Sequence, residues 1–142
     1  MKTTIKSTLS VLLALVFIVT LASCRTAAPT DVWENATYRE DMEFGSGANT
    51  VVVEIQVQEH EVTFTIKTDK QTVGEALLEH GLIAGEQSQY GMYVKQVNGM
   101  TADYDVDQSY WAFYVDGELA TTGVDTTEIT QEATYQLVYT KD

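Results

Sequence analysis

The 142-residue sequence is poor in cysteine, proline and basic side chains. It has one cysteine, Cys24, and one proline, Pro29, and its 21 acidic residues outnumber 8 lysines and arginines. A single cysteine cannot close an internal disulfide, so the hydrophobic core alone must hold the fold. The shortage of positive charge argues against nucleic acid as a partner and against docking on anionic lipid through a basic patch.

Side chains typical of catalysis are also scarce. The part of the sequence that follows Cys24 has three serines and two histidines, namely Ser46, Ser88, Ser109, His60 and His80. A Ser-His-Asp arrangement through Ser88 or Ser109 stays open in principle, but no nucleophile-elbow pattern surrounds either serine. The two histidines lack the close spacing of metal ligands. We therefore expect a protein that is not an enzyme and holds no metal.

Residues 1–23 have the pattern of a secretory signal peptide. Lys2 and Lys6 form a positive start, and the apolar run from Leu9 to Leu21 is short for a membrane span. The sequence L-A-S-C that ends at Cys24 resembles the lipobox of bacterial lipoproteins. This resemblance implies a lipid on Cys24 that anchors an extracytoplasmic protein to the bacterial cell membrane. The alternative is an ordinary signal peptide with an incidental cysteine.

Residues 24–48 are predicted to form a flexible tether. The segment begins with small residues around Pro29, ends with G-S-G-A, and carries net negative charge without a sustained apolar period. Such composition favours disorder. Trp33 leaves two alternatives open, because it can dock on the domain or fold back on lipid.

Residues 49–142 are predicted to form one α+β domain. Apolar residues alternate over 51–57, 62–67 and 133–139, which indicates strands. Thr72 and Glu75 have the spacing of a capping box at the start of a helix over 73–80. Further strands are expected over 89–97 and on either side of Asp116-Gly117, a strong hairpin signal. The order β-β-α-β-β-β-β, with one helix on a mixed sheet, is typical of a β-grasp-like fold.

Two features of this domain have alternative interpretations. The strand over 110–115 is apolar or aromatic on both faces, which predicts a central strand covered on each side. Asp103, Asp105 and Asp107 alternate as in a calcium loop, yet the glycine and the distal glutamate of such a loop are missing. We expect these aspartates to line the solvated face of a strand. The acidic excess as a whole fits solubility, or else a site for cations or a basic partner.

Several motifs resemble a known family when they are taken in order. They are T-V-G-E-A-L-L, Q-Y-G-M-Y-V-K-Q-V-N-G, S-Y-W-A-F-Y-V-D-G-E and the final Y-Q-L-V-Y-T. Residues 49–140 resemble the C-terminal β-domain of transcobalamin and intrinsic factor, and a bacterial family of transcobalamin-like domains found on lipoproteins. In the animal proteins this domain covers the upper face of cobalamin, and a helical barrel supplies the other half of the site.

The resemblance implies a ligand-binding face. Its ligand-facing positions are Gln89, Val94, Phe113 and Ala120, and Tyr90 and Trp111 extend the platform unless they are core aromatics. Because this sequence has no helical barrel, a second protein would have to close the site. The predicted function is non-catalytic binding of cobalamin or another corrinoid in capture or hand-over. The alternative is a cell-envelope interaction or structural module without a small ligand.

Overall fold

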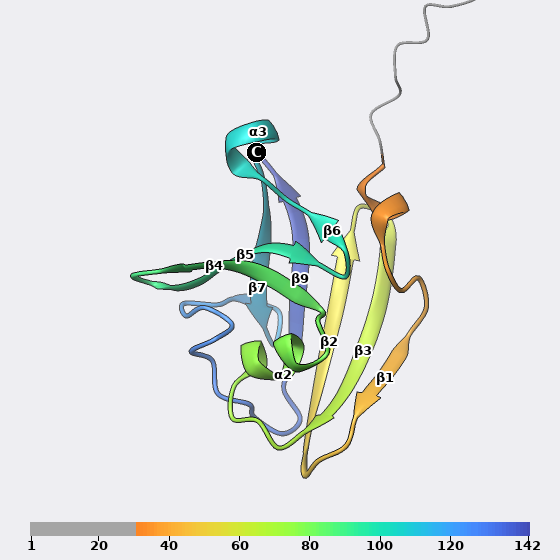
Figure 1. Cartoon of the computed structure of the whole chain (residues 1–142), viewed down its shortest axis with the longest axis vertical. Helices are drawn as coiled ribbons and strands as arrows, with labels where there is room; N and C mark the ends of the chain where they lie inside the picture. Colours follow the sequence, from red (N-terminus) through yellow and green to blue (C-terminus); the bar gives the residue numbers. More distant parts are fainter. Residues whose placement is uncertain (1–30) are drawn as a thin grey trace, which may run out of the picture. The chain divides into compact units, whose positions relative to one another are not determined.

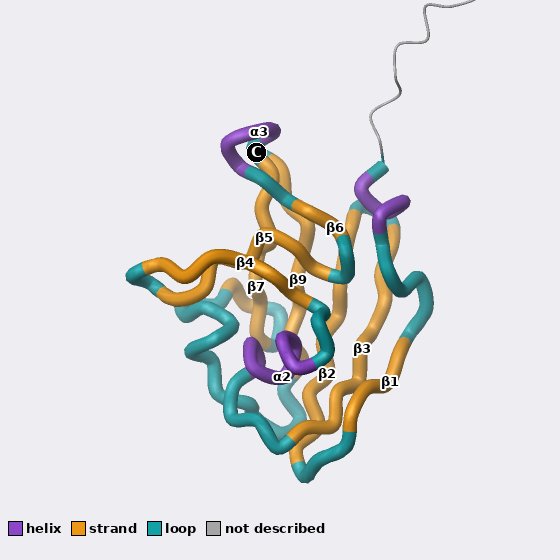
Figure 2. The backbone as a smooth tube through the Cα atoms, in the orientation of Figure 1, coloured by secondary structure: helices purple, strands orange, loops and turns teal. Residues whose placement is uncertain are grey.

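The computed structural model describes residues 31–142 (Figures 1 and 2). The predicted signal peptide over 1–23, the lipidation site Cys24 and residues 25–30 lie outside the described residues. In the part that is described, no helix is long and apolar enough to cross a membrane.

The expected α+β class is confirmed, since most of the domain is strand in two sheets with a short helix. The larger sheet has six strands in the order β1-β3-β2-β9-β7-β8, and the smaller has three in the order β4-β5-β6. The strands of the larger sheet are β1 (Met42–Gly45), β2 (Asn49–Val57), β3 (His60–Thr68), β7 (Ser109–Val115), β8 (Glu118–Leu119) and β9 (Thr134–Lys141). The smaller sheet contains β4 (Ile83–Ser88), β5 (Gly91–Val97) and β6 (Met100–Thr101).

The helical elements are short. They are the 3-10 turn η1 (Val32–Asn35), the helix α2 (Val73–Glu79) and the one-turn helix α3 (Tyr104–Asp107). The predicted element order omitted β1, β4 and β6. The prediction of a strand through the three aspartates is wrong, because residues 104–107 form α3.

The capping box at the start of α2 is confirmed. The Thr72 hydroxyl accepts a hydrogen bond from the Glu75 N–H at 3.3 Å, and the Glu75 carboxylate accepts one from the Thr72 N–H at 3.2 Å. The backbone N–H groups of Thr72 and Gln71 lower the pKa of Glu75. These contacts satisfy amides that the first turn of a helix leaves unpaired.

The core lies between one face of the larger sheet and a layer made of α2 and the smaller sheet (Figure 1). Alternate residues of β2, β3 and β9 supply most of it, and α2 adds Val73, Ala76 and Leu77. On β7 the same face carries Trp111, Phe113 and Val115, as the pairing with β9 requires. Tyr110, Ala112 and Tyr114 point to the opposite face, where Ala112 is buried and the two tyrosines are half-buried. The expectation that both faces of this strand are covered therefore needs a correction, because the second face is covered only in part.

The predicted flexible tether needs a correction for residues 31–48. These residues belong to the same compact unit as the rest of the domain. β1 pairs in parallel with β3, and Trp33 stacks on His60 with ring centroids 4.6 Å apart. The folded domain therefore begins at Asp31 rather than at Asn49, and Trp33 docks on the domain.

Candidate functional site

The first two candidate ligand-facing residues lie at the tip of the β4–β5 hairpin. Ser88 and Gly91 face each other across the hairpin, and the Ser88 hydroxyl donates to the Gly91 carbonyl at 2.7 Å. Gln89 and Tyr90 form the turn between them, where Gln89 is exposed and Tyr90 is 84% exposed. In Figure 1 this hairpin crosses β7 and extends beyond it. The two side chains are thus available to a ligand or a partner.

Asp125 fixes the start of β5 on the segment that follows β8. Its carboxylate accepts a hydrogen bond from the Met92 N–H at 3.0 Å. A Cβ on Gly91 would lie 2.8 Å from the same carboxylate, and Gly91 has φ 107°, so a side chain has no place there. Sequence reasoning missed Asp125, because its partner lies 33 residues away in the chain.

Phe113, in the second half of β7, and Ala120, directly after β8, lie opposite each other. The Ala120 N–H donates to the Phe113 carbonyl at 2.9 Å. Both residues are half-buried, and the Phe113 ring stacks on Tyr135 with centroids 6.2 Å apart. Together they present a partly open apolar surface at the margin of the core.

A solvent-open pocket of about 470 Å³ lies next to this pair. We call it the β7–β8 pocket, and it is lined by Val115, Asp116, Glu118, Leu119, Ala120, Thr121 and Thr122. Asp116 shapes it, because its carboxylate accepts from the Thr134 N–H at 2.9 Å and so ties the turn to β9. The Asp116-Gly117 hairpin signal located this region in the sequence, yet only Ala120 was singled out there.

Val94 and Trp111 do not join this surface. They are 8% and 7% exposed and belong to the hydrophobic core. The Trp111 ring packs edge-on against Tyr139, and its Nε1 is buried without a hydrogen-bond partner among the described residues. The expected platform of six residues on one exposed face therefore needs correction. The accessible candidates are Gln89 and Tyr90 at the hairpin tip, and Phe113 with Ala120 beside the pocket.

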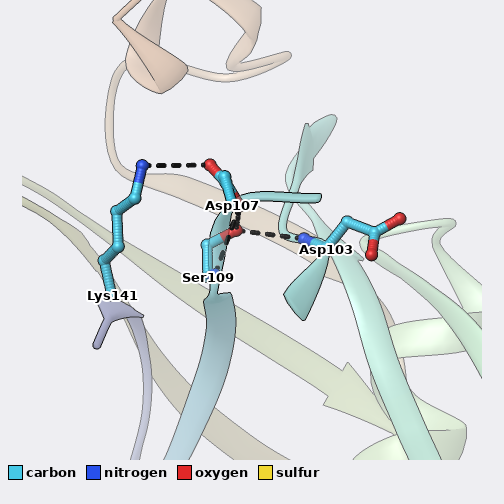
Figure 3. Close-up of polar contacts among 4 residues, drawn as sticks. All are labelled: Asp103, Asp107, Ser109 and Lys141. Carbon is cyan, nitrogen blue, oxygen red and sulfur yellow. Dashed lines mark hydrogen bonds and ion pairs between the residues drawn. The ribbon is translucent and has the colours of Figure 1, made fainter. Parts of the chain in front are cut away.

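Two of the three aspartates, Asp103 and Asp107, hold α3 in place (Figure 3). Asp103 caps the helix by accepting from the Asp105 N–H at 3.0 Å, and its own N–H donates to the Ser109 hydroxyl at 3.0 Å. Asp107 accepts from the Ser109 hydroxyl and from Lys141 Nζ, the latter at 3.2 Å. The hydrogen bond from Ser109 is the main cause that lowers the pKa of Asp107. Within residues 31–142, no three side chains of His, Cys, Asp or Glu converge as metal ligands.

Solved structures share this fold. A candidate metal-binding protein from Ruminococcus gnavus ATCC 29149 is 27% identical, with a TM-score of 0.63 over 67% of this chain and 99% of that one. Haptocorrin in complex with Cbi is 17% identical, with a TM-score of 0.51 over 69% of this chain and 26% of haptocorrin. These likenesses support the expected transcobalamin-like fold.

Sequence comparison places the chain in a family. None of the curated proteins matches it significantly. Residues 70–141, about half of the chain, match the family model described as domain of unknown function DUF4430. This match spans α2, the smaller sheet, the β7–β8 pocket and β9. The chain therefore belongs to the DUF4430 family.

Proposed function

We propose that the protein is an extracytoplasmic lipoprotein, anchored through Cys24, whose DUF4430 domain is a non-catalytic binding module for a small ligand. The observation that carries the binding role is the half-open pair of Phe113 and Ala120, which continues into the β7–β8 pocket. The volume of the β7–β8 pocket, about 470 Å³, is in the range of small-ligand sites, roughly 300–1,000 Å³.

Cobalamin or another corrinoid is the leading candidate ligand. The face of a corrin is broad and apolar, so it suits a surface that offers an aromatic ring beside backbone polar groups. The likeness of fold to haptocorrin, which was solved with Cbi, supports this choice. The pocket is open to solvent, so a second protein would have to cover the far side of the ligand. The module would then act in capture or hand-over.

A titration tests the binding role. The chain from residue 24 is titrated with cobalamin and with cobinamide and followed by visible absorbance and calorimetry, with and without EDTA to detect a contribution from metal. In Ala120→Arg a long side chain fills the pocket, and we expect at least about tenfold weaker binding, or 1.4 kcal/mol. Val106→Arg is the matched control, because Val106 is 80% exposed on α3, away from the pocket.

The result can contradict the proposal in two ways. Absence of binding up to about 1 mM, which corresponds to about −4 kcal/mol, would rule out a useful corrinoid site in the isolated chain. Equal binding by Ala120→Arg, Val106→Arg and the unmodified chain would place the ligand elsewhere.

The lipid anchor is tested separately in cells. We expect the protein in the membrane fraction, with acyl chains on Cys24 by mass spectrometry, because acyl chains hold a protein on a bilayer by about 0.8 kcal/mol per buried methylene. Cys24→Ser should release it from the membrane. Retention of Cys24→Ser in the membrane fraction, or an unmodified Cys24 in the membrane-bound protein, would refute the anchor.

An interaction module of the cell envelope is the second candidate function. It is favoured by two apolar side chains on separate hairpins, since Tyr90 is 84% and Leu119 is 66% exposed. Exposed apolar side chains mark a protein-binding surface when they lie in one contiguous patch, so a partner of this kind should contact both. For this role, Tyr90→Ser should abolish recovery of a cross-linked envelope partner from cells, and the unmodified chain should bind no corrinoid.

A further inference from the structure

Residues 31–45 form a strap that is part of the fold. The side chain of Asn98, itself only 1% exposed, binds the strap as a neighbouring strand would. Its Oδ1 accepts from the Tyr38 N–H at 2.9 Å, and its Nδ2 donates to the Tyr38 carbonyl at 2.7 Å. The Thr37 N–H also donates to the Asn98 carbonyl at 2.8 Å. A buried amide with all these partners holds the strap in one position.

Aromatic contacts fix the strap along its length. Tyr38 and Phe44 meet Phe64 edge-to-face, with ring centroids 5.9 and 5.4 Å apart. Nearer the start, the rings of Trp33 and His60 are stacked and nearly parallel, with an interplanar angle of 4°. Aromatic pairs of this kind stabilise a fold beyond the area that they bury. The strap is therefore bound at its beginning, middle and end.

A docked strap shortens the connection to the predicted lipid. Between Cys24 and Asp31 there are seven Cα-to-Cα steps, which reach at most about 25 Å when fully extended. The Cα atom of Asp31 can therefore lie no farther than this from that of Cys24. The flexible tether expected over 24–48 would have allowed the domain a far wider range.

The larger sheet has two different ends. β2 and β9 finish at the end where β1, β3 and β7 begin, as the pairing directions require. We call this the proximal end, and it carries η1, the β2–β3 turn, α3 and the C-terminus (Figure 1). The opposite, distal end carries the Asp116-Gly117 turn and the β7–β8 pocket. A nine-residue strand such as β2 spans about 30 Å, which separates the two ends.

From the strap and these two ends, we propose that the domain is mounted with its proximal end at the bilayer and the β7–β8 pocket facing outward. This inference rests on the lipid anchor proposed above. The connection keeps Asp31 within about 25 Å of Cys24, and the strap joins Asp31 to the proximal end, so this is the end that is tied to the lipid. The ligand, and any protein that closes the site, must then approach from the solvent side. Because β7 spans about 20 Å, a membrane-embedded acceptor would need an extracytoplasmic part at least that tall to reach the pocket.

Vesicles test this orientation without depending on lipidation in cells. Cys24 is the only cysteine, so the chain from residue 24 can be coupled there to a maleimide lipid. A fluorescent amino acid is placed at Glu59 on the proximal end or at Glu118 on the distal end, both exposed. Energy transfer to a dye at the membrane surface should be severalfold stronger from position 59. Equal transfer, or stronger transfer from position 118, would overturn the proposed orientation.

Two variants separate the strap from the anchor. A flexible 20-residue insertion between Thr30 and Asp31 leaves the described fold untouched, and it should lower transfer from position 59 toward that from position 118. The double variant Trp33→Ala and Asn98→Gly should have the same effect by releasing the strap, and Glu43→Gln, on an exposed residue of β1, is its control. An insertion without any effect would show that adsorption to lipid, and not chain length, sets the position of the domain.

A protein that carries no lipid in cells would give a different result from a protein that is oriented wrongly. If Cys24 is not acylated in vivo, the chemically anchored protein still reports the position of its two ends, while the mass spectrum of the native protein shows a free thiol. The orientation and the anchor can therefore fail independently.

Discussion

The Asn98 side chain offers the sharpest test of how the strap is held. Asn98 and Gly99 form the turn between β5 and β6, and both have positive φ, at 51° and 81°. This is the turn for which Asn-Gly is the favoured pair. Asn98→Gly keeps the backbone conformation and removes only the amide that binds Tyr38. Asn98→Ala removes the same amide and also places a Cβ in the left-handed region.

The expected losses follow from these contacts. The amide makes two hydrogen bonds to Tyr38, and each contributes about 0.5–1.5 kcal/mol net. Asn98→Gly should therefore lower the free energy of unfolding by about 1–3 kcal/mol. Asn98→Ala should cost about 1 kcal/mol more, because an L-residue at positive φ is strained.

Urea unfolding and hydrogen exchange read out the two effects. The urea concentration at the midpoint of unfolding should fall in both variants, while the dependence of the free energy of unfolding on urea concentration stays unchanged. The amide hydrogens of Thr37 and Tyr38 should exchange faster, because the strap opens locally more often. If Asn98→Gly unfolds within about 0.5 kcal/mol of the unmodified chain and its strap amides stay protected, the amide does not hold the strap.

Three further outcomes are expected. The pKa of Glu75 lies below its ordinary 4.5 in the folded chain. Its carboxylate therefore stabilises the fold above pH 4.5, and this contribution is lost as the pH falls through the folded pKa. Unfolding curves of Glu75→Gln and the unmodified chain should differ at pH 7 and converge in acid. Gly74→Ala should lower stability by about 1–3 kcal/mol in urea, despite better helix propensity, because its Cβ would lie 2.8 Å from the Asp125 backbone; a gain would show that the loop yields easily. Trp33→Ala should cost about 0.5–1.5 kcal/mol from the lost ring contact with His60, and a double-mutant cycle with His60→Ala should recover that coupling.

Features set by neighbouring residues could be predicted from the sequence. The Thr72 and Glu75 capping box involves residues three apart, and the Asp116-Gly117 turn involves adjacent ones. The alternation over 51–57 depends on the side-chain period of a strand, and every second residue there is buried. Each of these signals needs no knowledge of where the rest of the chain lies.

The strap could not be predicted in this way. Its apolar residues show no period, because each one meets a different and distant partner. Tyr38 binds Asn98, 60 residues along the chain, and Phe44 packs on Phe64. Charge and composition therefore suggested disorder where long-range contacts create order. At α3 the same difficulty arose, since the alternating aspartates concealed the role of Asp103 as a helix cap.

The candidate site shows what the alternation of side chains along a strand can and cannot predict. It places Trp111 and Phe113 on the same face of β7, and the structure agrees. Alternation does not say how far along a strand the covering layer extends. Trp111 is 7% exposed within the core, whereas Phe113, two residues farther toward the distal end, is half-buried. The difference between a core aromatic and a ligand-facing one is thus decided by the packing of other elements on β7.

The proposed orientation and the open pocket depend on each other. A pocket that faced the bilayer would be screened by headgroups, and a second protein could not easily cover it. In the proposed orientation the proximal end lies nearest the lipid, and the half-open surface at Phe113 and Ala120 lies toward the far end of β7, a strand about 20 Å long. A partner can then close over a bound ligand without displacing the anchor. If orientation in vesicles and loss of binding in Ala120→Arg are both observed, the missing half of the site should be sought among proteins exposed on the same cell surface.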